Sequence, residues 1–151
     1  SLACSTLSGA GSSYNVGIGK DALKMATGQS NVGIGKQAGN GITSGSYNIM
    51  IGIDADVGTP TGDYQLNIGS TIYGTLNTGQ VSLGTATPNA KAILDLTSTT
   101  LGFLPPRMTA TQRNAITSPP EGLMVFTTDY SDGTLFVYAD GCWEAITHHC
   151  P

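Results

Sequence analysis

The segment Asn31-Val32-Gly33-Ile34-Gly35 decides the fold, because four other segments of the chain share its pattern. The pattern is a carboxamide, an aliphatic residue, any residue, a second aliphatic residue and a glycine. The copies span residues 15–19, 31–35, 48–52, 65–69 and 80–84, so successive copies start 16, 17, 17 and 15 residues apart. Self-similarity at a nearly fixed period predicts a repeat architecture in which each copy adds one rung to a stack.

Each copy predicts a short strand followed by a corner. Val32 and Ile34 are two positions apart, so in a strand they point to one face while Gly33 points to the other. The closing glycine permits a corner with positive φ. Each rung therefore offers two inward aliphatic residues and a set of backbone edges, which is typical of β-roll or β-helix-like repeats.

Two inward aliphatic residues are too few to hold a single chain together. Burying both contributes roughly 3–6 kcal/mol, whereas ordering the backbone of one rung costs about 1–2 kcal/mol per residue. We therefore expect several identical chains to pack their inward faces around a common axis, as an elongated, intertwined β fibre. A monomeric β-roll or β-helix is the alternative.

The second half of the chain has a different composition. Of the 21 glycines, 17 lie at or before residue 84. We expect a repeat shaft over residues 1–86, a connector over 87–108 and a globular C-terminal module over 109–151. Thr109 and Gln112 have capping-box spacing and predict a short helix from Ala110 to about Ile116. Three strands over 122–127, 134–138 and 142–146 predict an antiparallel meander, so the module is α+β.

Composition excludes several classes of protein. Charged residues make up 11% of the chain, and six Lys+Arg against ten Asp+Glu give a net charge of −4, too acidic for nucleic-acid binding by phosphate neutralisation. No stretch approaches the ~18–20 apolar residues of a membrane span, so we expect no membrane insertion. Cysteine is sparse and odd in number at positions 4, 142 and 150, and the pattern leaves their pairing open. Because the chain starts at Ser1, we expect it to be part of a longer protein.

Two stretches resemble known families. The glycine-closed repeat, with Thr-Gly before the next carboxamide, resembles the repeats of trimeric phage tail fibres and the heads of trimeric autotransporter adhesins. The stretch Leu101-Gly102-Phe103-Leu104-Pro105-Pro106-Arg107-Met108-Thr109, the strand over 122–126 and the closing Trp143 resemble a module near the C-termini of phage tail fibres and related surface proteins. Together the resemblances cover roughly residues 13–146.

The resemblance implies a mainly β, homotrimeric fibre that ends in a globular tip and attaches a virion to a bacterium. The implied partners are two further copies of the chain, a bacterial cell-surface polysaccharide or other envelope receptor, and upstream fibre or tail proteins. The implied location is the virion tail fibre. The alternative is a bacterial trimeric surface adhesin on the cell surface, and a third class is a capsule-depolymerising enzyme.

Candidate receptor-binding residues lie in the C-terminal module. An aromatic ring with a polar tip offers a flat apolar face to a sugar ring and a hydrogen bond at its edge. The residues of this kind, together with an acidic neighbour in a predicted turn, are Tyr130, Asp132, Tyr138 and Trp143. The core of a small module is the alternative role for Trp143, as it is for Phe136.

The sequence offers little chemistry beyond binding. The acidic residues of the module fall mostly in predicted turns, and no spacing selects a glycosidase-like pair, so we expect no catalytic residues and no enzyme activity. His148 and His149 are the metal candidates, because residues near a three-fold axis would supply three imidazoles to an axial ion. A polar tail is the alternative, and no other cofactor is expected. Asp54 and Asp56, with Asp63 beyond, suggest either a hard-cation site or a solvated loop.

Overall fold

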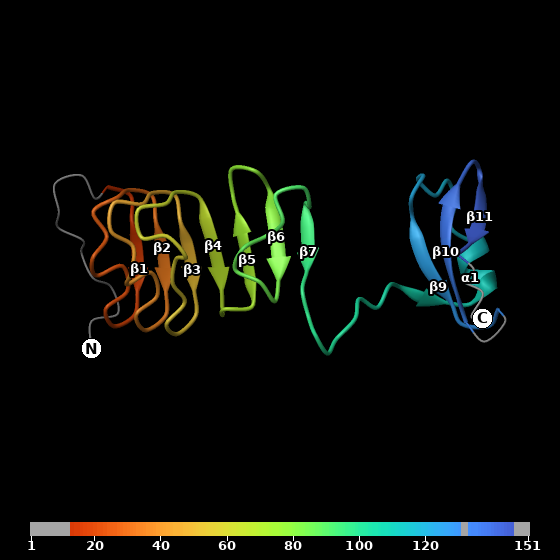
Figure 1. Ribbon diagram of the computed structural model, residues 1–151, viewed down its shortest axis with the longest axis horizontal. Coiled ribbons are helices and arrows are strands. Elements are labelled where there is room, and N and C mark those ends of the chain that lie inside the picture. The colour runs from red at the N-terminus through yellow and green to blue at the C-terminus, as the bar shows by residue number, and fades with distance from the viewer. Residues whose placement is uncertain (1–12, 131–132, 147–151) are drawn as a thin grey trace. The chain divides into compact units, whose positions relative to one another are not determined.

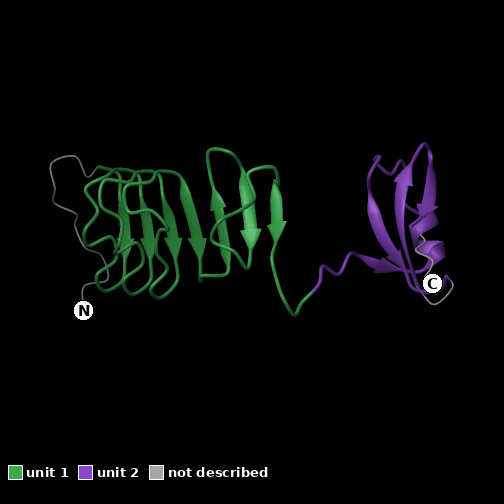
Figure 2. Cartoon of the chain, viewed as in Figure 1, with its two compact units in different colours: residues 1–101 green, residues 102–151 purple. Residues whose placement is uncertain are grey.

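The computed structural model describes residues 13–130 and 133–146. The described chain is mainly β, with 4% of residues in helix and 30% in strands. It divides into two compact units, Ser1–Leu101 and Gly102–Pro151 (Figure 2). The boundary falls inside the segment 87–108 that the sequence predicted as a connector.

Unit 1 contains one seven-stranded sheet in which the strands follow their order along the chain (Figure 1). The first four strands are parallel and one rung apart, while β5 is antiparallel to both β4 and β6. The last strand, β7, is parallel to β6. The strands are β1 (Val16–Ile18), β2 (Val32–Ile34), β3 (Ile49–Ile51), β4 (Gln65–Ile68), β5 (Ile72–Thr75), β6 (Gln80–Leu83) and β7 (Leu94–Leu96).

The five sequence repeats therefore form five strands of a β-solenoid, as predicted. Two further strands join the same sheet. The sequence pattern does not mark β5, which lies between the fourth and fifth copies and reverses the chain twice. The glycines that close the first three copies all have φ near +130°, namely Gly19, Gly35 and Gly52. A side chain at Gly35 would also lie against the carbonyl of Gly52 in the next rung.

The prediction that the aliphatic residues point inward is wrong for the single chain. The inside of the solenoid is lined by the residue between them, because Gly17, Gly33 and Met50 are buried. The small glycines leave room for side chains from the loops, and the buried apolar cluster consists of Leu23, Ala26, Ala38, Ile42 and Met50. A hypothetical Cβ at Gly33 would lie 2.8 Å from Cγ of Leu23, so this position has no space for a larger residue.

Unit 2 is a four-stranded sheet with one short helix, and its strand order is β11-β10-β9-β8. Strands β9, β10 and β11 form an antiparallel meander, and β8 adds to β9 in parallel. The sequence did not predict β8. The elements are β8 (Arg107–Met108), α1 (Ala110–Asn114), β9 (Met124–Thr127), β10 (Thr134–Ala139) and β11 (Cys142–Ala145).

The start of α1 is fixed by two side chains. The Thr109 hydroxyl accepts a hydrogen bond from the backbone N–H of Gln112, and the Gln112 side chain accepts one from the Thr109 backbone N–H, which completes a capping box. Asp129, in the turn after β9, accepts a hydrogen bond from the Ala110 backbone N–H at 2.7 Å. The helix ends at Asn114, about two residues before the end that the sequence predicted.

Candidate functional site

The outer face of the unit 1 sheet carries two rows of aliphatic side chains. Cross-strand partners share a face, so the register places the aliphatic residues of every repeat in line. One row is Val16, Val32, Ile49, Leu66, Gly74, Val81 and Leu94, and the other is Ile18, Ile34, Ile51, Ile68, Ile72, Leu83 and Leu96. We call these fourteen positions the aliphatic face.

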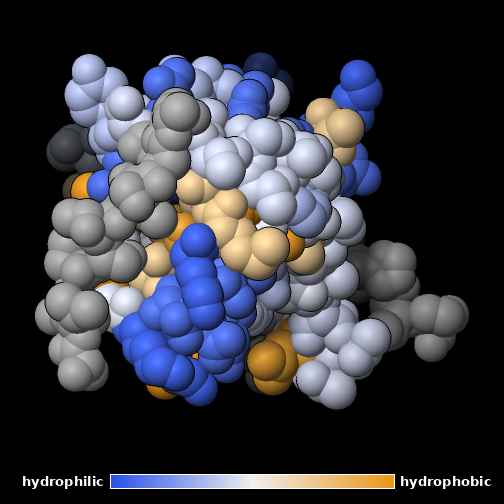
Figure 3. Space-filling model, turned by 90° about the vertical axis from the view of Figure 1, so that its left-hand side faces the viewer, coloured by the Kyte–Doolittle hydropathy of each residue, from blue (hydrophilic) through white to orange (hydrophobic). Residues whose placement is uncertain are grey.

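The aliphatic face is not covered by the chain itself. Val16 and Ile18 are 45% and 46% exposed, and Leu94 and Leu96 at the other end are 52% and 43% exposed. A contiguous apolar surface of this kind marks a protein–protein contact. The end of the solenoid turned to the viewer in Figure 3 also shows hydrophobic side chains among strongly hydrophilic ones.

The candidate receptor-binding aromatics of unit 2 lie on one face of its sheet. Tyr138 and Trp143 are cross-strand partners and their rings meet edge to face, with centroids 5.4 Å apart. Tyr130 meets Phe136 in the same way at 5.3 Å. Phe136 is buried, Tyr138 and Trp143 are half-buried, and Tyr130 is 47% exposed. Phe136 therefore has the predicted core role, and Tyr130 presents the most accessible ring.

A buried arginine joins these aromatics, and sequence reasoning missed it. The Arg113 guanidinium carbon lies 4.0 Å from the ring centroid of Phe136 and 6.0 Å from that of Trp143. Its Nε and Nη2 donate to the Asn114 side-chain oxygen, while Nη1 is buried without a hydrogen-bond partner. A single arginine in a five-residue helix has no sequence pattern that would distinguish it from a surface cation.

Two of the three carboxylates that suggested a cation site bind backbone N–H groups, whereas the third, Asp54, is exposed. Both oxygens of Asp56 accept from the Gly41 N–H, at 2.8 and 3.0 Å, and Asp63 accepts from the Ser46 N–H at 2.7 Å. Each bond connects neighbouring rungs, so these residues stabilise the stack. At the exposed corner after β1, the Lys20 and Lys24 ammonium groups lower the pKa of Asp21, with the hydrogen bond from Lys20 the largest cause.

Three candidate residues lie outside the part of the chain that the structure describes. These are Asp132, His148 and His149. Cys4 and Cys150 also lie outside the described residues. Within the described ranges, no group of three or more metal-ligating side chains comes together, and the thiol of Cys142 is free and exposed. Within the same ranges, no helix combines the length and apolar character needed to cross a bilayer.

Comparison with known protein families gives a match to part of the chain. Residues 82–149, slightly less than half of the chain, match a family model described as a phage tail like trimerisation region. No curated protein and no solved structure matches the chain at a significant level. The matched residues include β7 and every helix and strand of unit 2. In a trimer, two further copies would be available to cover the aliphatic face. The match of residues 82–149 to a phage tail like trimerisation region supports a phage tail fibre-like protein that assembles as a homotrimer.

Proposed function

We propose that this chain is part of a phage tail fibre, that it binds a receptor on the bacterial surface, and that the ligand is a surface polysaccharide. The match of residues 82–149 to a phage tail like trimerisation region supports the structural part of this role. In the proposed role, the chain is part of the virion tail, is attached to upstream fibre or tail proteins, and brings the particle to its host by binding rather than by catalysis.

The exposed ring of Tyr130 carries this proposal. It lies in the turn between β9 and β10, and its contact with Phe136 has an interplanar angle of 77°. An edge-to-face contact with a buried ring fixes the orientation of the tyrosine while nearly half of its surface stays accessible. A pre-oriented aromatic ring with a hydroxyl tip suits a sugar ring, because little conformational entropy is lost on binding.

Trimerisation strengthens weak contacts of this kind. A polysaccharide repeats the same unit, so three equal sites on one particle can be engaged at once. The second and third contacts then form at a high effective concentration, and avidity exceeds the affinity of one site by orders of magnitude. A low affinity for a single saccharide is therefore compatible with firm attachment.

Two acidic residues of unit 2, Asp129 and Glu121, favour binding without hydrolysis. Asp129 holds the first N–H of α1, and Glu121 accepts a hydrogen bond from the Asp140 backbone N–H at 3.1 Å. A glycosidase needs two carboxyl groups facing one bond, one of them with a raised pKa. Asp129 and Glu121 are instead bonded to backbone groups at different turns.

The test is binding of the labelled full chain to a panel of bacteria and to their purified polysaccharides. We expect Tyr130→Ala to lose most of the binding, whereas Tyr14→Ala, which removes an even more exposed tyrosine in unit 1, keeps it. Equal binding by both variants would refute the site. Release of reducing sugars from the bound polysaccharide would refute a purely binding role.

A further inference from the structure

The sheet of unit 2 has a second face that no described element of unit 2 covers. The aromatics and Arg113 lie on one side, and strand alternation places the remaining apolar residues on the other. Met124 and Ile146 are 40% and 50% exposed. The register lines up the half-buried or exposed apolar members of this side, which are Met124, Phe126, Leu135, Val137 and Ile146. We call these five residues the open face.

The two edges of the open face carry opposite charges. Arg107 on the edge strand β8 is the cross-strand partner of Phe126, and Glu144 on the edge strand β11 is the partner of Val137. Both side chains therefore belong to the open face, and both residues are exposed. Among the residues that the structure describes, neither forms an ion pair.

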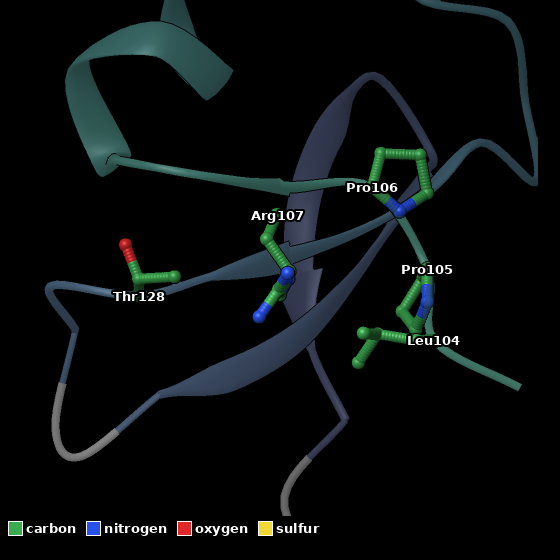
Figure 4. A pocket seen from close by; sticks show the side chains of 5 residues that line it. All are labelled: Leu104, Pro105, Pro106, Arg107 and Thr128. Atoms are coloured by element: carbon green, nitrogen blue, oxygen red, sulfur yellow. The ribbon is translucent and has the colours of Figure 1, made fainter. Parts of the chain in front are cut away.

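A pocket lies beside the cationic edge. It has a volume of about 580 Å³ and is lined by Leu104, Pro105, Pro106, Arg107 and Thr128. Figure 4 shows the Arg107 side chain between Thr128 on one side and Leu104 on the other. The pocket thus combines an apolar wall with one positive charge, which fits an aliphatic side chain that has a carboxylate close by.

The opposite edge of the same sheet, strand β11, has the aliphatic side chain of Ile146 close to the carboxylate of Glu144. We propose that, in the trimer, the β11 edge of each subunit docks on the β8 edge of its partner. Ile146 enters the pocket, and Glu144 pairs with Arg107 of the partner subunit. This inference rests on the trimeric state and not on receptor binding.

The charges of Arg107 and Glu144 favour a ring of subunits over a two-fold symmetric dimer. A two-fold contact between two β11 edges would bring Glu144 against Glu144, whereas a head-to-tail contact places unlike charges together. Head-to-tail contacts form closed rings when the rotation between subunits fits, and a rotation of one third of a turn closes with three copies. The open faces then point toward the common axis and cover one another.

Cysteine cross-linking of the full chain tests the contact. In a background with Cys4, Cys142 and Cys150 changed to serine, we combine Arg107→Cys with Glu144→Cys. Strands β8 and β11 are three strand spacings apart, about 14 Å, beyond the ~7 Å Cα reach of a disulfide, so the pair cannot close within one chain. We expect a covalent trimer of about 46 kDa, three times 15.4 kDa, on a non-reducing gel.

The single variants are the controls. Arg107→Cys alone and Glu144→Cys alone should give no covalent product under the same oxidation. Covalent dimers from Glu144→Cys alone would overturn the ring. If light scattering shows a trimer but the double variant gives no cross-linked trimer, the docking proposal fails while trimerisation stands. If the unmodified chain is not a trimer, trimerisation itself fails.

Charge exchange gives a second readout. Trp143 is the only tryptophan, so its fluorescence reports unfolding of unit 2 even when unit 1 keeps the chains together. We expect Arg107→Glu or Glu144→Arg to lower the midpoint of the Trp143 melt by at least about 4 °C, and the double exchange to restore it. Lys91→Glu, an exposed charge reversal in unit 1, should leave this midpoint unchanged. Absence of restoration in the double exchange would contradict the ion pair.

Discussion

The buried side chain of Asn31 connects its own rung to that of Asn48 through two hydrogen bonds. Its Oδ1 accepts from the Asn48 backbone N–H at 3.0 Å, and its Nδ2 donates to the carbonyl of Gly45 at 2.9 Å. Asn15 bonds to the rung of Asn31 in the same way, and Asn48 bonds to the rung of Gln65. A carboxamide suits this position because its oxygen accepts and its separate NH₂ group donates, so that one side chain bonds to two backbone groups of the next rung.

Removing one carboxamide should therefore weaken unit 1. Asn31→Ala leaves the Asn48 N–H and the Gly45 carbonyl without their partners, and each unsatisfied buried group costs about 1–3 kcal/mol. We expect unfolding free energy to fall by roughly 2–4 kcal/mol in urea titration followed by circular dichroism. Asn77→Ala, at an exposed turn, is the control and should change it by less than about 0.5 kcal/mol.

The glycine in the middle of β2 should not tolerate a side chain. In Gly33→Ala the new methyl group would lie within 3.0 Å of the Leu23 side chain and of the Ala38 carbonyl oxygen, and the backbone atom cannot move away without shifting its rung. We expect a loss of about 1–3 kcal/mol in the same titration. Gly58→Ala is the control, because only the end of the Gln65 side chain lies near this glycine. An equal loss of unfolding free energy in Gly58→Ala would show that crowding inside the solenoid does not cause the loss in Gly33→Ala.

A charge on the aliphatic face should break the trimer without unfolding the chain. Ile34→Asp places a carboxylate where two further copies would bury it, whereas in the free chain this position is already 37% exposed. On dilution, light scattering should show the mass falling from three chains toward one at concentrations where the unmodified chain, with contacts in both units, stays trimeric, and the circular dichroism spectrum should be unchanged. Ile53→Asp makes the same substitution outside the two rows, at 72% exposure, and should leave the trimer intact.

Arg113 should be replaceable by an apolar residue of similar length. Its guanidinium stacks on Phe136, but one nitrogen is buried without a partner, and among the described residues no carboxylate pairs with it. Arg113→Met keeps the packing and removes the buried charge, so we expect the unfolding free energy to change by less than about 1 kcal/mol. Arg113→Ala leaves a cavity and should cost about 2 kcal/mol or more, as measured by Trp143 fluorescence in urea.

The sequence predicted the solenoid because its repeats carry their own hydrogen-bonding and corner residues. Asn31 forms hydrogen bonds to the next rung, and Gly35 forms the corner after its own strand. The residues that define the solenoid therefore recur in every repeat and can be recognised in the sequence. The interior could not be predicted in this way. Alternation shows that a strand has two faces, but it does not show which face is buried by the same chain. That depends on Leu23 and Ile42, which come from loops that differ between rungs.

The site could be predicted only where a residue acts alone. Tyr130 follows from its turn and its aromatic ring, and the structure leaves it accessible. Arg113 becomes significant only through Phe136 and Trp143, which lie 23 and 30 residues further along the chain. Arg107 and Glu144 share a face only because a parallel strand, β8, joins the meander, and a two-residue strand leaves no periodicity to detect.

The antiparallel strand β5 also has a kinetic consequence. Ile68 and Ile72 are paired across four residues, whereas Val16 and Val32 are paired across 16. Closing the shorter loop costs about 1 kcal/mol less entropy, so we expect the β4–β5–β6 hairpins to form before the long rungs. The rungs would then be added from β3 back to β1, against the direction of synthesis, and pulse-labelled hydrogen exchange would show protection spreading toward the N-terminus.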